Sequence, residues 1–297
     1  MEKKNRKQEI MTEEETNGDN TYFLDAESPV EMARLTHLDR ITTLAMGGPL
    51  VGVVEPIKLR NIVDLGCGPG SWVLDVAFDL PAAEIEGVDI SRTMVDYANA
   101  RARTQQLPNA SFGVMDITRP LDFPDSAFDL VNARFLVGVL PRVNWPGFIA
   151  ECTRILRPGG TIRLTEMVDA GVSTSPAFER LQSLLYQAFW RGGYSFSVDG
   201  TTLGITHTLS PLLRAAGYQD VRRLAHTMEF SVNTDGWMDF YRNAEIGYKL
   251  VQPFYVKTGV ATQEELDQLY QQMLIEMHAS NFYGLWHHVT FLGTKPT

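Results

Sequence analysis

The chain has 297 residues, of which 44% are hydrophobic and 21% are charged. This length fits one large domain around a single hydrophobic core better than two unrelated domains. The composition excludes a chain that is disordered throughout. A formal net charge of −10 would repel a phosphate backbone, so the sequence disfavours nucleic acid as a partner.

Hydropathy and cysteine content limit the cellular setting. No apolar run approaches the roughly 20 residues that a membrane-spanning helix needs, and the first 20 residues lack the apolar centre of a secretory signal. We therefore expect a cytoplasmic protein without a membrane partner. Two cysteines, Cys67 and Cys152, are too few for a disulfide framework, and a zinc site would need several histidines besides. We expect both to stay reduced and no metal to be bound.

The amino-acid composition changes once in the first part of the chain, after residue 20. Residues 1–20 are polar and cannot offset the entropy cost of ordering, so we predict a disordered tail. We predict that residues 21–297 form a single domain. Ser28 and Pro29 predict a capped helix start. Apolar residues then recur at three- and four-residue spacing, at Met32, Leu35, Leu38 and Ile41.

Short β-rich runs alternate with helical runs over residues 61–170. This pattern is typical of parallel strands joined by crossover helices, and it predicts an α/β fold. Strands are predicted at residues 62–65, 85–89, 111–115, 128–132 and 161–165. Apolar stripes mark two of the helices, at residues 73–80 and 145–156, and the second should stop at Arg157-Pro158-Gly159-Gly160.

The second half of the chain, residues 171–297, is richer in aromatic residues and more helical. An amphipathic helix around residues 178–189 is typical of a wall or lid. Ser210 and Pro211 predict the cap of a short helix that ends at Gly217. The remaining predicted elements are a strand at 221–230, a helical insertion at about 234–280, and a last strand at 286–292 that pairs with the preceding one.

The most specific signal is Val63-Asp64-Leu65-Gly66-Cys67-Gly68-Pro69-Gly70, between a predicted strand and a predicted helix. Glycines at this place let the backbone approach a ligand at the carboxyl end of a sheet. A dinucleotide site would use G-x-G-x-x-G to seat a pyrophosphate, but Pro69 removes one backbone donor that a phosphate needs. The loop therefore favours another nucleoside cofactor over a nicotinamide dinucleotide.

Two carboxylates follow the next two predicted strands. Asp89 ends the second strand, where a carboxylate can accept hydrogen bonds from two ribose hydroxyls. Asp116 follows the third strand, where it can accept a hydrogen bond from an exocyclic amine. Because the carboxyl ends of parallel strands meet at one edge of the sheet, these residues and the glycine loop indicate one nucleoside site.

In these motifs the chain resembles the class I S-adenosylmethionine-dependent methyltransferases, in their small-molecule and ubiquinone-biosynthesis-like branch. The resemblance spans about residues 22–230. It rests on five elements in order: the glycine loop, Val88-Asp89-Ile90-Ser91 with Met94, Asp116-Ile117, Phe128-Asp129-Leu130-Val131, and Leu156-Arg157-Pro158-Gly159-Gly160. It implies a Rossmann-like, mostly parallel sheet of seven strands, the last antiparallel, with helices on both faces, a helical cap insertion and S-adenosyl-L-methionine as cofactor.

The resemblance also assigns cofactor contacts. The loop of Gly66, Cys67 and Gly68 would lie beside the methionine moiety, with a backbone contact from the cysteine. Asp89 would bind the ribose, and Asp116 the adenine amine. Three apolar side chains would pack against the adenine: Ile90, Met94 and Ile117.

Two further segments would surround the methionine end. The backbone from Asn132 to Arg134 would border it. Residues 21–60 look like the N-terminal lid of related enzymes, with Tyr22 and Arg34 near the cofactor carboxylate. Leu38 departs from the pattern, because relatives often carry glutamine at this place. Residues 61–170 would then be the cofactor-binding core, and residues 171–297 the acceptor-binding half.

Methyl transfer sets modest chemical demands. A sulfonium methyl group is already a good electrophile, so the protein's main task is to hold it in line with the nucleophile. A hydroxyl or carbon acceptor would gain from a base within hydrogen-bond reach. Three residues are the candidates for that base: His207, His226 and Glu166.

Each candidate residue has a structural alternative. The glycines of the loop could serve tight strand-to-helix packing, Asp89 could cap a helix, and Asp116 could be a turn residue. Isolated histidines such as His207 and His226 are usually structural or surface groups. The sequence supports each alternative less well than the five elements together support a cofactor site.

The predicted function is S-adenosylmethionine-dependent methyl transfer to oxygen, nitrogen or carbon of a small metabolite. Two alternatives stay open. One is a protein that keeps the cofactor site without transferring a methyl group, and the other is a nicotinamide-dependent oxidoreductase. Residues 173–194 and 235–280 would select the acceptor, but they match no pattern that identifies it. The helical insertion would either cover the site or form the contact of a homodimer.

Overall fold

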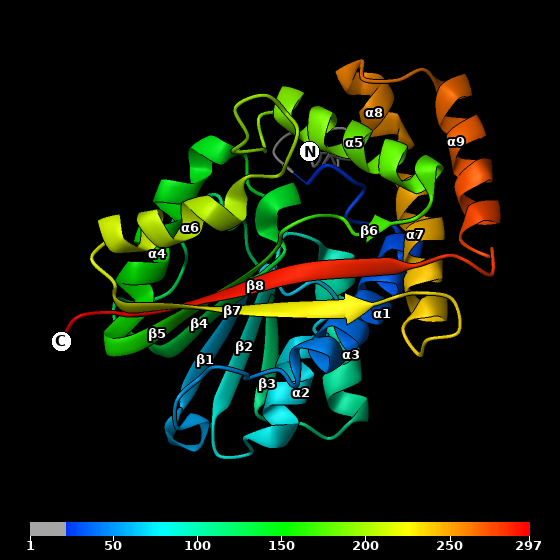
Figure 1. Cartoon of the computed structure of the whole chain (residues 1–297). Helices are drawn as coiled ribbons and strands as arrows, with labels where there is room; N and C mark the ends of the chain where they lie inside the picture. Colours follow the sequence, from blue (N-terminus) through cyan, green and yellow to red (C-terminus); the bar gives the residue numbers. More distant parts are fainter. Residues whose placement is uncertain (1–21) are drawn as a thin grey trace, which may run out of the picture.

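The computed structural model describes residues 22–297 as a central β-sheet with helices on both faces (Figure 1). The strands are β1 (Asn61–Leu65), β2 (Glu84–Asp89), β3 (Ala110–Val114), β4 (Phe128–Arg134), β5 (Leu156–Met167), β6 (Val172–Ser173), β7 (Gln219–Glu229) and β8 (Gly284–Thr294). The predicted tail, residues 1–20, lies outside the described residues. Within residues 22–297, no helix is long and apolar enough to cross a membrane.

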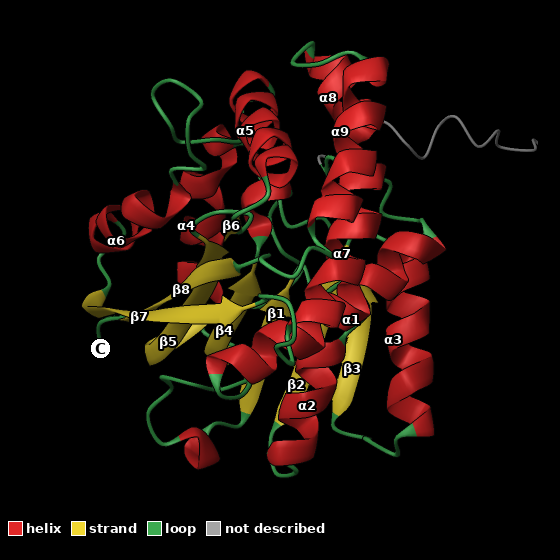
Figure 2. Cartoon of the chain, turned by 45° about the vertical axis from the view of Figure 1, so that its right-hand side comes forward, coloured by secondary structure: helices red, strands yellow, loops and turns green. Residues whose placement is uncertain are grey.

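The helices form layers on either side of this sheet, with α4 and α6 on one face and α1, α2 and α3 on the other (Figures 1 and 2). They are α1 (Pro29–Met46), α2 (Ser71–Asp79), α3 (Arg92–Thr104), α4 (Trp145–Ile155), α5 (Pro176–Arg191), α6 (Ile205–Ala215), α7 (Trp237–Leu250), α8 (Gln252–Thr258) and α9 (Gln263–Glu276). Short 3-10 turns lie at η2 (Pro56–Lys58), η3 (Leu136–Gly138) and η4 (Arg142–Asn144). The predicted α/β class is confirmed.

Strand order places the carboxyl ends of the first strands side by side. The order runs β3-β2-β1-β4-β5-β8, and the pairs from β3 to β5 are all parallel. β8 pairs antiparallel with β5 and with β7, so the last strand runs against the others, as the resemblance implies. The chain reverses direction in strand order between β1 and β4, which is where open α/β sheets bind ligands.

Over residues 22–297 the sheet has eight strands rather than the seven expected. The additional strand is β6, whose two residues pair with Leu285 and Gly284 at the start of β8. β6 lies beyond the end of β5, along the same edge of β8 as β5. β7 pairs with the other edge of β8. The difference is therefore a short extension of the β5 edge.

The helix at residues 205–215 also differs from expectation. Ser210 and Pro211 were predicted to begin it, but α6 begins at Ile205 and contains Pro211 in its interior. Ile205, Leu209 and Leu213 are fully buried at four-residue spacing, and burial of this stripe outweighs the backbone hydrogen bond that a proline cannot donate. A smaller difference lies at residues 157–160, which belong to β5 rather than to a turn after α4.

The predicted cap at Ser28 is confirmed, and α9 begins with a cap of the same kind. The backbone N–H of Glu31 donates to the Ser28 hydroxyl at the start of α1, and that of Glu265 donates to Thr262 at the start of α9. Each cap satisfies a backbone donor that has no partner within the helix. The helix that follows the Ser28 cap, α1, packs against α7.

Two large apolar clusters divide the molecule. One lies between the sheet and α4 and α6, and includes Trp145 and Leu209. The other joins α1, α5, α7 and α9 through Phe178, Phe240 and Met273. The second cluster fixes the helical insertion, which contains α7, α8 and α9, over α5 and beside the carboxyl ends of the strands (Figure 1).

Candidate cofactor and acceptor site

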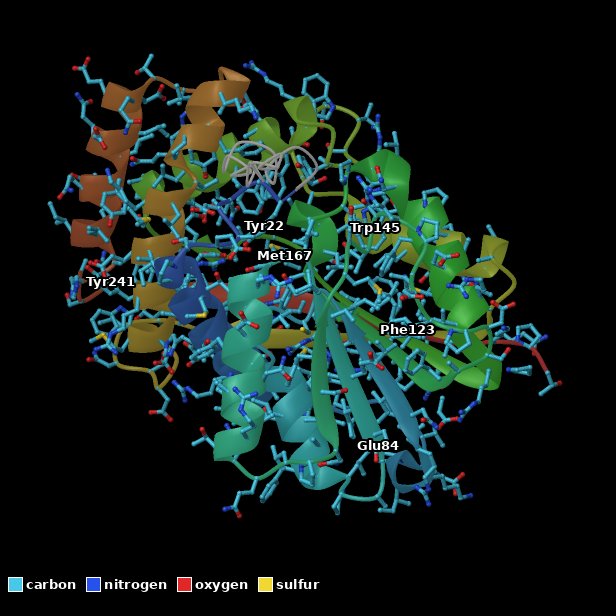
Figure 3. All side chains as sticks on the ribbon, turned by 180° about the vertical axis from the view of Figure 1, so that it is seen from behind. Tyr22, Glu84, Phe123, Trp145, Met167 and Tyr241 are labelled. Carbon is cyan, nitrogen blue, oxygen red and sulfur yellow. The ribbon has the colours of Figure 1, made fainter. Side chains whose placement is uncertain are left out.

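A cavity of about 260 Å³ opens at the carboxyl ends of the parallel strands. Its walls come from the glycine loop, the residues that follow β2, β3 and β4, and faces of α1, α5 and α7. Tyr22 and Met167, both on the wall, lie between the sheet and the cap helices in Figure 3, whereas Glu84, at the start of β2, lies at the other end of the sheet. The cavity is therefore where the strand order predicts a ligand.

The glycine loop uses its own backbone donors. The N–H groups of Gly66 and Cys67 both donate to the Val88 carbonyl, at 2.8 and 2.9 Å, and that of Gly70 donates to Cys67 at 3.1 Å. The Gly68 N–H donates to the Asp89 carboxylate at 2.8 Å. Since proline has no N–H, no amide from residue 66 to residue 70 is left to bind a pyrophosphate. This observation argues against a nicotinamide dinucleotide.

Glycine is required at two places in this loop. Gly68 has φ +52°, in the left-handed region that side chains rarely adopt, and it lines the cavity. At Gly70 a Cβ atom would lie 2.5 Å from Phe112 and 2.7 Å from the Ala98 Cβ. The strand-to-helix packing alternative therefore holds for Gly70, while Gly68 leaves its backbone open to a ligand.

Asp89 has the lone pairs that a ribose needs. One carboxylate oxygen accepts from Gly68 and the other from the Ser91 N–H at 3.0 Å, so each oxygen keeps a second lone pair. Burial raises the pKa of this carboxyl above its ordinary value, partly offset by those hydrogen bonds. Ser91 itself caps α3. Asp89 therefore supports the start of α3 through Ser91 and also lines the cavity.

Asp116 combines a turn with a place on the cavity wall. One of its oxygens accepts from the Thr118 N–H and hydroxyl, at 2.8 and 2.7 Å. The other lies 3.1 Å from Nε of Arg119. The turn alternative is thus correct, and it does not displace the ligand interpretation, because Asp116 and the neighbouring Ile117 both line the cavity.

Comparisons with known proteins agree with this geometry. A family model described as a methyltransferase domain matches residues 62–160. The chain is 35% identical over 130 residues to the aklanonic acid methyltransferase DauC of Streptomyces sp., covering 41% of this chain and 55% of that protein. It is 27% identical over 253 residues to a trans-aconitate 2-methyltransferase of Deinococcus radiodurans, covering 83% and 91%. These matches support a class I S-adenosylmethionine-dependent methyltransferase, with a methyltransferase domain at residues 62–160.

Solved structures share the fold. The YcgJ protein of Bacillus subtilis aligns with a TM-score of 0.53 at 16% identity, over 86% of this chain and 99% of that one. A putative methyltransferase of Bacillus halodurans aligns with a TM-score of 0.51 at 14% identity, over 88% and 99%. S-adenosylmethionine is the cofactor of this methyltransferase, and the cavity fits it, with an open glycine backbone and two carboxylates at neighbouring strand ends.

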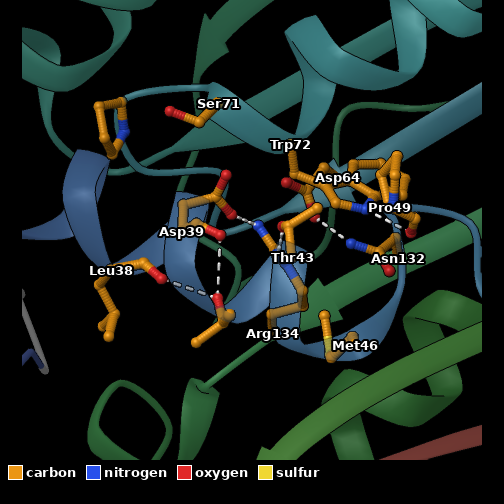
Figure 4. Close-up of polar contacts among 12 residues, drawn as sticks. Leu38, Asp39, Thr43, Met46, Pro49, Asp64, Ser71, Trp72, Asn132 and Arg134 are labelled. Carbon is orange, nitrogen blue, oxygen red and sulfur yellow. Dashed lines mark hydrogen bonds and ion pairs between the residues drawn. The ribbon is translucent and has the colours of Figure 1, made fainter. Parts of the chain in front are cut away.

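The structure brings most of the predicted cofactor residues of the methyltransferase together. Eleven of the twelve line the cavity: Tyr22, Arg34, Gly66, Cys67, Gly68, Asp89, Ile90, Met94, Asp116, Ile117 and Arg134. The exception is Asn132, which is fully buried and is not on the wall. Its amide donates to Asp64 at 2.7 Å (Figure 4). The amide oxygen accepts from Arg163 at 2.7 Å. Asn132 therefore belongs to a buried hydrogen-bonded network of Asp64, Asn132 and Arg163 beneath the loop.

This hydrogen-bonded network explains the role of Asp64. Burial raises the pKa of its carboxyl to about 7, although Asn132 and the charge of Arg163 oppose the shift. A buried acid needs hydrogen bonds to remain in a core, and the Asn132 amide supplies one. Asp64 lies two residues before Gly66, near the end of β1, so this network fixes the start of the glycine loop.

The N-terminal helix closes one side of the cavity. Glu31 is fully buried and accepts from the Tyr22 hydroxyl at 2.5 Å and from Arg34 at 2.6 and 2.7 Å. Arg34 also donates to Asn243 of α7 at 2.8 Å. The lid predicted for residues 21–60 is thus tied to the helical insertion, more than 200 residues away in sequence.

A second ion pair, partly buried, lies further along α1. Arg134, at the end of β4, forms an ion pair with Asp39 and donates to the Thr43 hydroxyl at 3.1 Å (Figure 4). Both charged residues line the cavity. Leu38 is on the wall as well, where its apolar side chain offers no hydrogen bond.

The three candidate bases are not brought to the cavity. His207 is exposed on α6, and His226 lies on β7, 3.1 Å from the Thr290 hydroxyl. Burial and the charge of Arg163 lower the pKa of His226. Neither histidine is on the wall. A base must reach the proton it removes, and the structure brings neither histidine to the cavity, so their role as bases stays a prediction.

Glu166 is buried behind the wall. It is only 1% exposed and accepts from the backbone N–H groups of Leu136 at 2.6 Å and Val137 at 3.4 Å. Burial raises the pKa of its carboxyl to about 8, although these two hydrogen bonds oppose the shift. Glu166 therefore holds the turn after β4 and does not face a substrate.

Sequence reasoning missed much of the far wall. One face of α7 lines the cavity through Phe240, Asn243, Ala244, Gly247 and Tyr248. Their three- and four-residue spacing was available as a signal for a buried helix face, but nothing local says which cavity it covers. Phe135 and Trp286 were missed too. They are brought to the cavity by the turn after β4 and by the pairing of β8 with β5.

Proposed function

We propose that this protein transfers the methyl group of S-adenosylmethionine to oxygen, nitrogen or carbon of a small, largely apolar metabolite. The observation that carries the proposal is the continuity of the cavity. The same cavity is bordered by Gly68 and Asp89 at the strand ends and by Phe240 and Trp286 at the cap. A cofactor and a second small molecule would therefore meet inside one enclosure.

We assign the strand-end half to the cofactor. Asp89 would accept from the ribose hydroxyls, and Asp116 would accept from the adenine amine. The side chains of Ile90, Met94 and Ile117 would contact the adenine faces. When bound, S-adenosylmethionine supplies an electrophilic methyl group. The residues of this chain bind it, orient it and keep it apart from bulk water.

We assign the half beneath α5 and α7 to the acceptor. Its wall is mainly apolar, with Leu185 and Phe189 from α5 and Phe240 and Val251 from the insertion. Such a wall favours an acceptor that buries apolar surface, with a few polar groups to fix its orientation. The relatives are named for aklanonic acid and trans-aconitate, and both names support a small-molecule acceptor here.

Positioning carries most of the proposed catalysis. Among the described residues on the cavity wall there is no histidine, lysine or glutamate. Holding the nucleophile in line with a reactive methyl group can contribute several orders of magnitude by itself. The proposal therefore favours acceptors whose attacking atom ionises readily or carries a free lone pair.

A titration tests the cofactor half first. Purified protein is titrated with S-adenosylhomocysteine and, separately, with reduced nicotinamide adenine dinucleotide. Micromolar binding of S-adenosylhomocysteine alone supports the proposal and justifies a screen of apolar metabolites for S-adenosylhomocysteine release. Binding of the nicotinamide alone, or of neither ligand, contradicts it. A protein that binds S-adenosylhomocysteine and yields no product with any acceptor would be the cofactor-binding alternative.

A further inference from the structure

Phe135 has an unusual backbone at the mouth of the acceptor half. It follows β4 directly and has φ +58°, in the left-handed region. For a residue with a Cβ atom this conformation is strained, and such residues gather at binding and catalytic sites where the surrounding structure enforces them. The half-buried ring of Phe135 lines the cavity.

Three hydrogen bonds enforce this conformation. The Phe135 N–H donates to the Thr165 carbonyl at 2.8 Å, which continues the pairing of β4 with β5. The next two N–H groups, of Leu136 and Val137, donate to the buried carboxylate of Glu166. A buried carboxyl group is costly without partners, so these contacts fix the turn and the acid together.

The turn also touches the cofactor half. Leu136 lies so close to the glycine loop that a Cβ atom at Gly66 would be 3.0 Å from its Cδ2. Phe135 is the residue before it. The turn that carries Phe135 therefore contacts the loop expected to carry the methionine end, and the Phe135 ring lines the same cavity as that loop.

A second aromatic residue completes this wall. The Trp286 ring lies 6.1 Å from the Phe135 ring with an interplanar angle of 18°, and it lines the cavity too. Its indole N–H donates to the Asp169 carbonyl at 2.9 Å. The buried ring of His288 meets Trp286 and Phe135 edge-on at 4.1 and 5.3 Å. Both aromatic rings are thus held in fixed orientations.

We propose that Glu166 holds Phe135 in its strained conformation so that the Phe135 and Trp286 rings form the surface against which a flat, unsaturated methyl acceptor lies. Phe135 and Trp286 are then specificity-determining residues, and Glu166 is a positioning residue. This inference rests on the proposed function and narrows it, because two nearly parallel rings favour a planar π-system over a puckered ring of the same size.

Two matched probes test the inference. Protein saturated with S-adenosylhomocysteine is titrated with 1-naphthol and with decahydro-1-naphthol, which share a carbon skeleton and a hydroxyl group but differ in planarity. We expect the wild type to bind the flat probe about 3- to 10-fold more tightly. Phe135→Leu, Trp286→Leu and Glu166→Gln should reduce that ratio towards one. Phe282→Leu, a buried position away from the cavity wall, should leave it unchanged, and Phe135→Trp should retain it.

The outcomes separate two failures. If the wild type does not bind S-adenosylhomocysteine, the proposed function fails. If it binds S-adenosylhomocysteine but holds the two naphthol probes equally, or holds neither, only the aromatic surface is refuted. A flat-probe preference that survives in Phe135→Leu and in Trp286→Leu also refutes it. The wild-type ratio decides the question even where a variant does not fold.

Discussion

Backbone strain at Phe135 predicts which of two substitutions, to alanine or to glycine, leaves the protein more stable. Phe135→Ala and Phe135→Gly remove the same ring and leave the same gap, so the two variants differ mainly in backbone preference. A left-handed residue with a Cβ atom costs roughly 1–2 kcal/mol, whereas glycine adopts φ +58° freely and loses about 0.5–1 kcal/mol through chain entropy. Glycine should therefore be favoured over alanine by up to about 1.5 kcal/mol at this position, opposite to the usual order.

A helical position supplies the control. Leu185 lines the same cavity from the middle of α5, and there Leu185→Gly should be less stable than Leu185→Ala by about 1 kcal/mol. The free energy of unfolding of all four variants is measured by urea denaturation, with the slope of the transition checked for each. Phe135→Ala at least as stable as Phe135→Gly would show that the backbone at Phe135 is not strained, and the argument for an enforced turn would fall.

Three further predictions concern the site. Asp89→Ala should weaken S-adenosylhomocysteine binding more than tenfold, measured by calorimetry, because it removes the ribose contacts and the partner of the Gly68 N–H; unchanged affinity would remove the cofactor assignment. Glu166 has a folded pKa of about 8, raised by burial from an ordinary value of 4.5, so its contribution to stability is present at low pH and lost as pH rises between these values. Glu166→Gln should flatten that fall, which is at most about 1.4 kcal/mol per pH unit, and equal slopes for both proteins would contradict the assignment. His207→Ala should leave S-adenosylhomocysteine affinity and turnover within twofold, because His207 is exposed on α6, and a large loss of turnover would restore it as a base.

The cofactor half was predictable because its signals are local. The glycine loop follows β1, Asp89 is the last residue of β2, and Asp116 lies two residues after β3. The pairing of parallel neighbours brings these strand ends together without further information. Asn132 was misplaced by the same logic. It lies within β4, two residues before Arg134, which does line the cavity, and its side chain donates to Asp64 instead.

The acceptor half depends on contacts between distant segments. The α7 face containing Phe240 was recognisable as helical, but its position follows from packing against α1 and from the hydrogen bond between Arg34 and Asn243. Nothing in the sequence predicts the positive φ of Phe135, because phenylalanine rarely adopts that conformation. Side chains and strain set by tertiary contacts lie outside what periodicity can predict.

Glu166 shows why an acid at a strand end does not always line the cavity. Acids at strand ends did mark the site at Asp89 and Asp116, and Glu166 lies near the end of β5 in the same way. Successive side chains of a strand point to opposite faces, however, and it is the next residue, Met167, that lines the cavity. Glu166 instead faces the backbone of the turn at Leu136. The strand end alone therefore does not identify a ligand contact, because the parity of the residue along the strand decides whether its carboxylate meets a substrate or supports the turn that does.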